Sequence, residues 1–81
     1  LALANLHNID AEVFEFEVLP KAKVTKKRIK ELKFPREAVF GGIIRDGKAL
    51  MSYGDFQIES GDKAIVFCLP EAIHIVEDLF R

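Results

Sequence analysis

The stretch that decides the fold runs from residue 41 to residue 67 and reads GGIIRDGKALMSYGDFQIESGDKAIVF. Short apolar segments in it are separated by glycine-aspartate pairs, which is the pattern of strands joined by tight turns. Asp46-Gly47 suits the two-residue loop of a β-hairpin. Gly54-Asp55 predicts a further turn, and Gly61-Asp62 another one before an apolar strand at 63–69. The stretch therefore predicts an antiparallel sheet.

Two adjacent glycines, Gly41 and Gly42, lie inside the strand expected at 38–45 and predict a bulge or a close approach by another backbone or a ligand. One interpretation is that bare backbone and a guanidinium line a ligand groove, since arginine binds phosphate or carboxylate through two parallel hydrogen bonds. The alternative is that the glycines make room for a crossing strand and that Arg45 pairs with an acid such as Asp46. The candidate ligand-binding residues are Gly41, Gly42, Ile43, Arg45 and Asp46.

The flanking segments predict one more strand and three helical segments. Residues 11–19 alternate between apolar and polar positions, as a half-buried strand does. The spacing over 25–33 is helical, with Thr25 as N-cap, and 70–81 has the pattern of an amphipathic helix. Residues 1–8 read as the last turns of a further helix. The order predicts an α+β single domain, a small βαβββα-type sandwich with an antiparallel-rich sheet and two helices.

Charge is divided unevenly along the 81 residues, although the net charge is only −1. Residues 21–36 contain eight basic residues and one acid, whereas the rest of the chain has four basic and twelve acidic residues. This separation of charge produces an electrostatic field with a positive and a negative pole, which can steer charged partners. The basic run is interpreted as a solvated face, with an acidic partner as the alternative. Nucleic acid is disfavoured because Phe34 is its only aromatic residue.

The residue types that often carry chemistry lack the partners that chemistry needs. The single cysteine, Cys68, lies in an apolar strand, which favours a packing role over a role as a nucleophile. A lone cysteine cannot form a framework of disulfides, and this indicates a reducing, cytoplasmic setting. His7 and His74 are far apart in the sequence and have no ligand at metal-binding spacing. The aspartates at 46, 55 and 62 fall in turns, where they can bond the backbone. We therefore expect no catalytic site and no metal site.

The last helix has a wide apolar stripe. Its members are Ala72, Ile73, Ile75, Val76, Leu79 and Phe80. A core-facing helix accounts for most of this stripe. The excess could cover a second copy of the chain, because homodimers with twofold symmetry are the commonest oligomers.

With these elements in order, the chain resembles the TrkA C-terminal domain, the C-lobe of the family of regulators of potassium conductance. Each motif is short, but their order and spacing together match the family from residue 11 to residue 80. The matching motifs are AEVFEF at 11–16, KELKFP at 30–35, GIIRDG at 42–47, GD at 54–55, GD at 61–62, IVF at 65–67 and AIHIVEDLF at 72–80.

The resemblance implies a non-catalytic regulatory domain of a Trk- or Ktr-type potassium transport protein. Residues 11–81 would be this domain, and 1–10 would be the tail of a linker helix from a nucleotide-binding domain. No cofactor is implied for 11–81 itself, since NAD or another nucleotide would sit in that preceding domain. The implied partners are a second copy and a membrane potassium-transporter subunit, at the inner face of the cell membrane.

The resemblance also implies sensing of a small anionic or nucleotide ligand, which in some members of the wider family is a cyclic dinucleotide. Two alternatives remain open at this point. The chain could be a purely structural dimerisation lobe of another transporter. It could also be a nucleic-acid-binding module that uses 21–36, although no nucleic-acid partner is expected.

Overall fold

The fold is built around β5 (Lys63–Cys68), the last strand in the chain and the central strand of the sheet. The computed structural model describes residues 2–6, 9–51 and 54–81. All strand pairs in it are antiparallel, in the order β1-β2-β5-β3-β4, which confirms the expected α+β class. The other elements are β1 (Ala2–Leu6), β2 (Ile9–Glu17), β3 (Ala38–Arg45), β4 (Lys48–Leu50), α1 (Ile73–Leu79) and the 3-10 turns η1 (Lys23–Thr25), η2 (Ile29–Glu31) and η3 (Pro70–Ala72).

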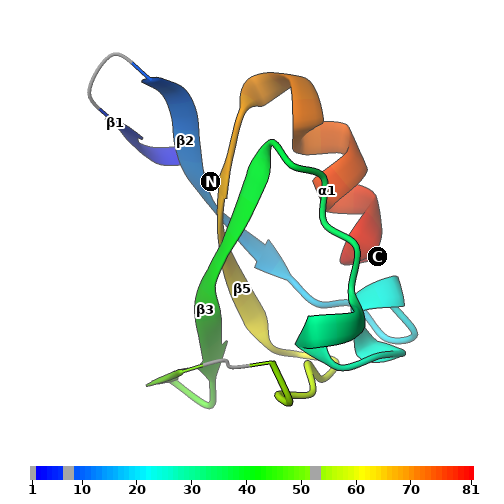
Figure 1. Cartoon of the computed structure of the whole chain (residues 1–81). Coiled ribbons are helices and arrows are strands. Elements are labelled where there is room, and N and C mark those ends of the chain that lie inside the picture. The colour runs from blue at the N-terminus through cyan, green and yellow to red at the C-terminus, as the bar shows by residue number, and fades with distance from the viewer. Residues whose placement is uncertain (1, 7–8, 52–53) are drawn as a thin grey trace.

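The hydrophobic core lies on one face of this sheet. Val66 of β5 is fully buried and lies opposite Phe14 of β2 on one side and Phe40 of β3 on the other. Val76 and Phe80 cover the core, and α1 and the 3-10 turns lie on the same side of the sheet (Figure 1). The strands predicted at 11–19, 38–45 and 63–69 are confirmed, because their alternation matches this one buried face.

The helix predicted at 25–33 is wrong, because η1 and η2 occupy this region as two separate 3-10 turns. A helix would need the amide of Ile29 to bond the carbonyl of Thr25. The Ile29 amide instead donates to the Phe56 carbonyl at 3.0 Å, and the Thr25 carbonyl accepts from Gln57 Nε2 at 2.9 Å. Thr25 is not an N-cap either, since its hydroxyl donates to the Ala22 carbonyl at 2.7 Å. Bonds to the loop at 54–58 have replaced the helical ones.

The helical reading of residues 1–8 is also wrong over Ala2–Leu6, which form β1. Pairing with β2 gives the peptide groups of this segment partners instead. Residues 1, 7 and 8 lie outside the described part, and the assignment of 1–10 to an interdomain linker stays a prediction.

The C-terminal helix is confirmed, although it begins with the 3-10 turn η3 and becomes α-helical at Ile73. Its apolar stripe is largely used by the core. Ala72, Val76 and Phe80 are buried, whereas Ile75 is 57% exposed. The part of the stripe left over for a second copy is therefore narrower than the sequence indicated. Among the described residues, no helix has the length and apolar character needed to cross a membrane.

Candidate functional site

The segment singled out in the sequence, residues 41–46, forms the second half of β3 and the start of its hairpin. The strand pairing shifts register between Phe40 and Gly42, so the predicted bulge is present at Gly41. A Cβ on Gly41 would lie 3.0 Å from Phe67 Cε2 and 3.1 Å from the Ile65 carbonyl oxygen. This glycine therefore makes room for the neighbouring strand β5, as the alternative interpretation expected.

The other four candidate residues do not all lie in one site. Gly42 is half-buried opposite Ile65, and the Ile43 side chain is 1% exposed within the core. Asp46 is exposed in the hairpin turn, where it and Gly47 have φ values of 53° and 76°. Positive φ at both positions is the requirement of a type I′ turn. Of the five residues, only Arg45 brings a functional group into a cluster of polar groups.

Arg45 forms a two-pronged ion pair with Asp62. The distances are 2.8 Å from Nε to Oδ1 and 2.8 Å from Nη2 to Oδ2. Nη2 also donates to the Gln57 carbonyl at 3.1 Å, and the guanidinium carbon lies 5.0 Å from the centre of the Phe56 ring. Nη1 has a longer contact, 3.6 Å, to Glu59 Oε2. The expectation that Arg45 pairs with an acid is thus confirmed, but the acid is Asp62 rather than Asp46.

Asp62 is 2% exposed, the only charged residue buried to this degree in the described part of the chain. Burial by itself raises the pKa of its carboxyl. Hydrogen bonds from Arg45 and from the backbone amide of Glu59, at 2.9 Å, outweigh that effect and hold the pKa below its ordinary value. The pKa of Arg45 is raised in turn, chiefly by its hydrogen bonds to Asp62. The pair is therefore ionised at neutral pH.

The cluster joins three segments of the chain. Arg45 holds the loop at 57–62, and Gln57 Nε2 of that loop donates to the carbonyls of Thr25 and Lys27 at 2.9 and 3.2 Å. Antiparallel pairing of β3 with β5 places Ile44 opposite Lys63, so the next pair along is Arg45 and Asp62. From the sequence, Asp62 is expected only in a turn, with its side chain bonded to the backbone. The signal that identifies this partner is the antiparallel register of the strands at 38–45 and 63–69, which neither strand specifies by itself.

Other candidate groups show packing or surface contacts. Burial raises the pKa of the Cys68 thiol, whose Sγ donates to the Leu69 carbonyl at 3.1 Å. His74 Nδ1 lies 4.0 Å from Glu77 Oε1 on the surface, and His7 is outside the described residues. The described ranges contain no group of three or more His, Cys, Asp and Glu side chains that could hold a metal ion. Asp55 pairs with Lys30 at 2.8 Å.

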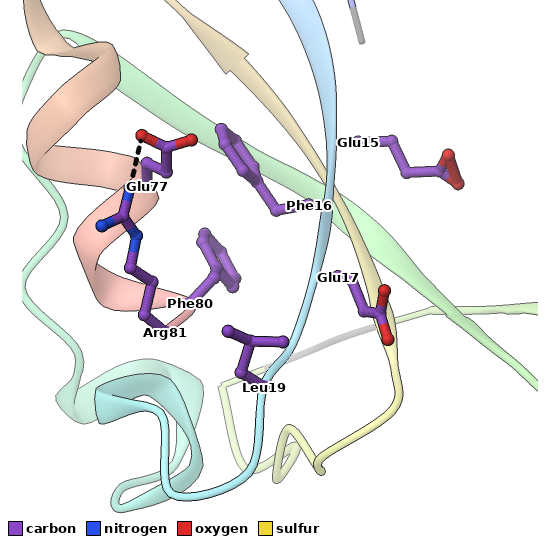
Figure 2. Close-up of a pocket in the computed structure, with 7 residues that line it drawn as sticks. All are labelled: Glu15, Phe16, Glu17, Leu19, Glu77, Phe80 and Arg81. Atoms are coloured by element: carbon purple, nitrogen blue, oxygen red, sulfur yellow. Dashed lines mark ion pairs between the residues drawn. The ribbon is translucent and has the colours of Figure 1, made fainter.

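Two surface hollows lie away from residues 41–46. The first, of about 280 Å³, lies between β2 and the end of α1, and Figure 2 shows its residues. Phe16 and Phe80 stack in it with ring centres 5.1 Å apart, and Arg81 pairs with Glu77 at 3.0 Å. Glu15 and Glu17 also line this hollow, but their side chains lie on the opposite side of β2 from Phe16 (Figure 2). The second hollow is basic and lies beside the 3-10 turns.

Comparisons with known proteins agree with this architecture. The family model of the TrkA-C domain matches residues 13–81. Trk system potassium uptake protein TrkA homolog 2 of Methanosarcina mazei is 32% identical over 80 residues, which are 99% of this chain and 18% of that protein. The TrkA homolog of Archaeoglobus fulgidus is 28% identical over 81 residues, 100% of this chain and 19% of that protein. The chain thus spans less than a fifth of these relatives.

A solved structure described as "Structure of RCK domain with cda" has a similar fold. The TM-score is 0.73 at 23% sequence identity, over 85% of this chain and 97% of that one. At this identity the likeness shows the fold alone.

Proposed function

Since this chain belongs to the TrkA-C domain family, we propose that it is the regulatory C-terminal domain of a Trk-type potassium uptake protein and is not itself an enzyme. The observation that carries this proposal is the family match over 13–81, together with a Trk system relative at 32% identity. The domain would work in the cytoplasm at the inner face of the membrane, against a potassium-transporter subunit. Any nucleotide cofactor would belong to a preceding domain.

A homodimer is the second part of the proposal. Two exposed apolar side chains support it, Ile75 on α1 and Val39 on β3, which are 57% and 63% exposed. Val39 lies opposite Phe67 on the sheet face that turns away from the core, and Phe67 is itself only partly buried. These two side chains lie on different surfaces, because α1 packs on the core side of the sheet and Val39 faces the other side. A second copy laid on either surface would remove apolar area from water. A structural dimerisation lobe without a ligand remains the alternative.

Ligand sensing at 41–46 is the third part. The structurally similar protein is described as an RCK domain solved with cda. In this chain, Nη1 of Arg45 is available to an anion, because its contact to Glu59 is 3.6 Å long and lies at the surface. An anion would displace Glu59 rather than Asp62, because the Asp62 bonds are short and buried. A ligand of this kind acts on a gate only through different affinities for two arrangements of the protein.

The regulatory role is tested by domain exchange. This chain would replace the segment of Methanosarcina mazei TrkA homolog 2 that aligns with it, and rubidium influx would be measured in cells that lack their own potassium uptake regulators. We expect the chimera to retain influx control that a protein without the segment loses. A chimera that behaves like the deletion would contradict the proposal.

The dimer and the ligand have separate tests. Light scattering across a range of concentrations should give twice the mass of 9.2 kDa. A cyclic dinucleotide should raise the melting temperature of the wild-type chain, and the rise should grow with the logarithm of the ligand concentration once that exceeds the dissociation constant. A monomeric mass at every concentration would remove the dimer, and an unchanged melting temperature would remove this ligand.

A further inference from the structure

The second surface hollow is lined mainly by lysines. It has a volume of about 330 Å³ and lies where η1, η2 and the end of α1 meet. None of its residues belongs to the segment 41–46. We call it the lysine cleft, and its lining residues are Lys23, Lys26, Lys27, Glu31, Leu32, Lys33 and Leu79.

The charge of the lysine cleft is largely uncompensated. Within the described residues, none of its four lysines forms an ion pair, whereas Lys30 nearby is paired with Asp55 at 2.8 Å. Its one acid, Glu31, accepts a hydrogen bond from the backbone amide of Arg28 at 3.0 Å. Four ammonium groups around one hollow repel each other and attract an anion.

The backbone that presents these lysines is held in place by the core of the domain. Val24 is fully buried, and the Gln57 amide binds the carbonyls of Thr25 and Lys27. The Ile29 amide is bonded to the Phe56 carbonyl. The lysine side chains are flexible, but the backbone positions that carry them are fixed by these contacts.

The shape and composition of the cleft discriminate between classes of anion. No arginine lines it, so it lacks the planar fork that binds one phosphate or carboxylate through two parallel hydrogen bonds, and its lysines supply point charges that attract either group. A hollow does not fit a flat bilayer surface. Its two leucines, Leu32 and Leu79, offer an apolar floor within a basic rim. A polypeptide segment with an apolar side chain between carboxylates complements both features.

We propose that the lysine cleft docks an acidic segment of a partner protein, with an apolar side chain of that segment seated on Leu32 and Leu79. This inference goes beyond the regulatory role proposed above, because it concerns a different surface and does not require a ligand at 41–46. Its failure would therefore leave the domain-exchange and light-scattering results unaffected.

The test uses fluorescence anisotropy of a labelled octapeptide of sequence DELDELDE. Binding to the wild-type chain should weaken steadily as salt is raised, since exposed charges are screened. The double variant K26Q/K27Q should bind about fivefold to tenfold more weakly at low salt. The matched control K48Q/K63Q removes two exposed lysines outside the cleft and should bind like the wild type. The peptide DESDESDE should bind more weakly than DELDELDE.

Each other outcome overturns the inference. Equal weakening by K48Q/K63Q would show a response to net charge alone. Absence of peptide binding at low salt would exclude this kind of partner. Binding of phosphatidylserine vesicles that is lost in K26Q/K27Q, without peptide binding, would assign the cleft to a membrane surface. Displacement of the peptide by an equimolar amount of inorganic pyrophosphate would assign it to a small phosphate ligand. Equal unfolding midpoints of the two variants and the wild type establish that all three proteins are folded.

Discussion

Arg45 and Asp62 lie next to each other across the β3–β5 pair and are joined by two hydrogen bonds of 2.8 Å. The Asp62 side chain is buried, and the Arg45 side chain is 26% exposed. This arrangement ties the end of one strand to the loop that leads into the next. Both residues therefore contribute to stability before any ligand is considered.

Replacing Arg45 by alanine should lower the free energy of unfolding by about 3 kcal/mol, because it leaves the buried carboxylate of Asp62 without its partner. The measurement is urea unfolding followed by circular dichroism. Arg36→Ala is the matched control, since Arg36 is exposed, and its effect should stay within about 0.5 kcal/mol. A loss as small as that for Arg45→Ala would show that water and Glu59 compensate for the missing ion pair.

Acid should destabilise the domain partly through Asp62. Its folded-state pKa lies below the ordinary value of about 3.9, so the unfolded chain takes up the proton first as the pH falls. The stability that the ionised group contributes is complete above about pH 4 and is lost as the pH falls through the folded-state pKa. Asp62→Asn should flatten the decline of the urea midpoint with acid below about pH 5. Asp78→Asn, at an exposed position, should leave that decline unchanged. Equal slopes for wild type and Asp62→Asn would refute this assignment.

Cys68 should resist alkylation in the folded protein. Its side chain is fully buried and its thiol pKa is raised, so little thiolate is accessible at pH 8. Reaction with iodoacetamide should be at least about tenfold slower than in the unfolded chain, because it requires opening of the central strand. The control is the same protein in concentrated guanidinium chloride. Similar rates in both conditions would mean that β5 is not protected.

Gly41→Ala should destabilise the domain by about 1–3 kcal/mol through overpacking against β5. Part of that cost comes from the Phe67 ring edge, so a double-mutant cycle with Phe67→Leu should give a coupling of at least about 0.5 kcal/mol. Gly47→Ala is the control, because a Cβ there has no neighbour within 4 Å and its cost is backbone strain alone. Additive effects of Gly41→Ala and Phe67→Leu would count against the contact.

The parts of the fold that the sequence predicted correctly are those whose pattern is local. Alternation over 11–19 and 63–69 and the Asp46-Gly47 turn depend on neighbouring residues only, and all three are confirmed. The bulge at Gly41 belongs with them, since two adjacent glycines weaken a strand interior and favour irregular pairing at that point.

The errors arose where distant residues supply the hydrogen bonds. The segment at 25–33 has helical spacing, but its amides and carbonyls are bonded by the loop at 54–58. Ala2–Leu6 are extended because β2 offers them a partner. For the candidate site, the sequence indicated Arg45 but not its partner Asp62. The two residues meet only in the observed register of β3 against β5, and the sequence of either strand alone does not specify that register.

The position of β5 in the middle of the sheet also has a consequence for the order in which the domain can be made. β2 and β3 do not pair with each other, and each of them pairs with β5, which comes after both in the chain. A ribosome that has released residues up to 62 has therefore made two long strands without the one that joins them. The sheet can close only when 63–68 emerge, and the core only when Val76 and Phe80 follow. We therefore expect protection from proteases and from association with other nascent chains to come late in synthesis.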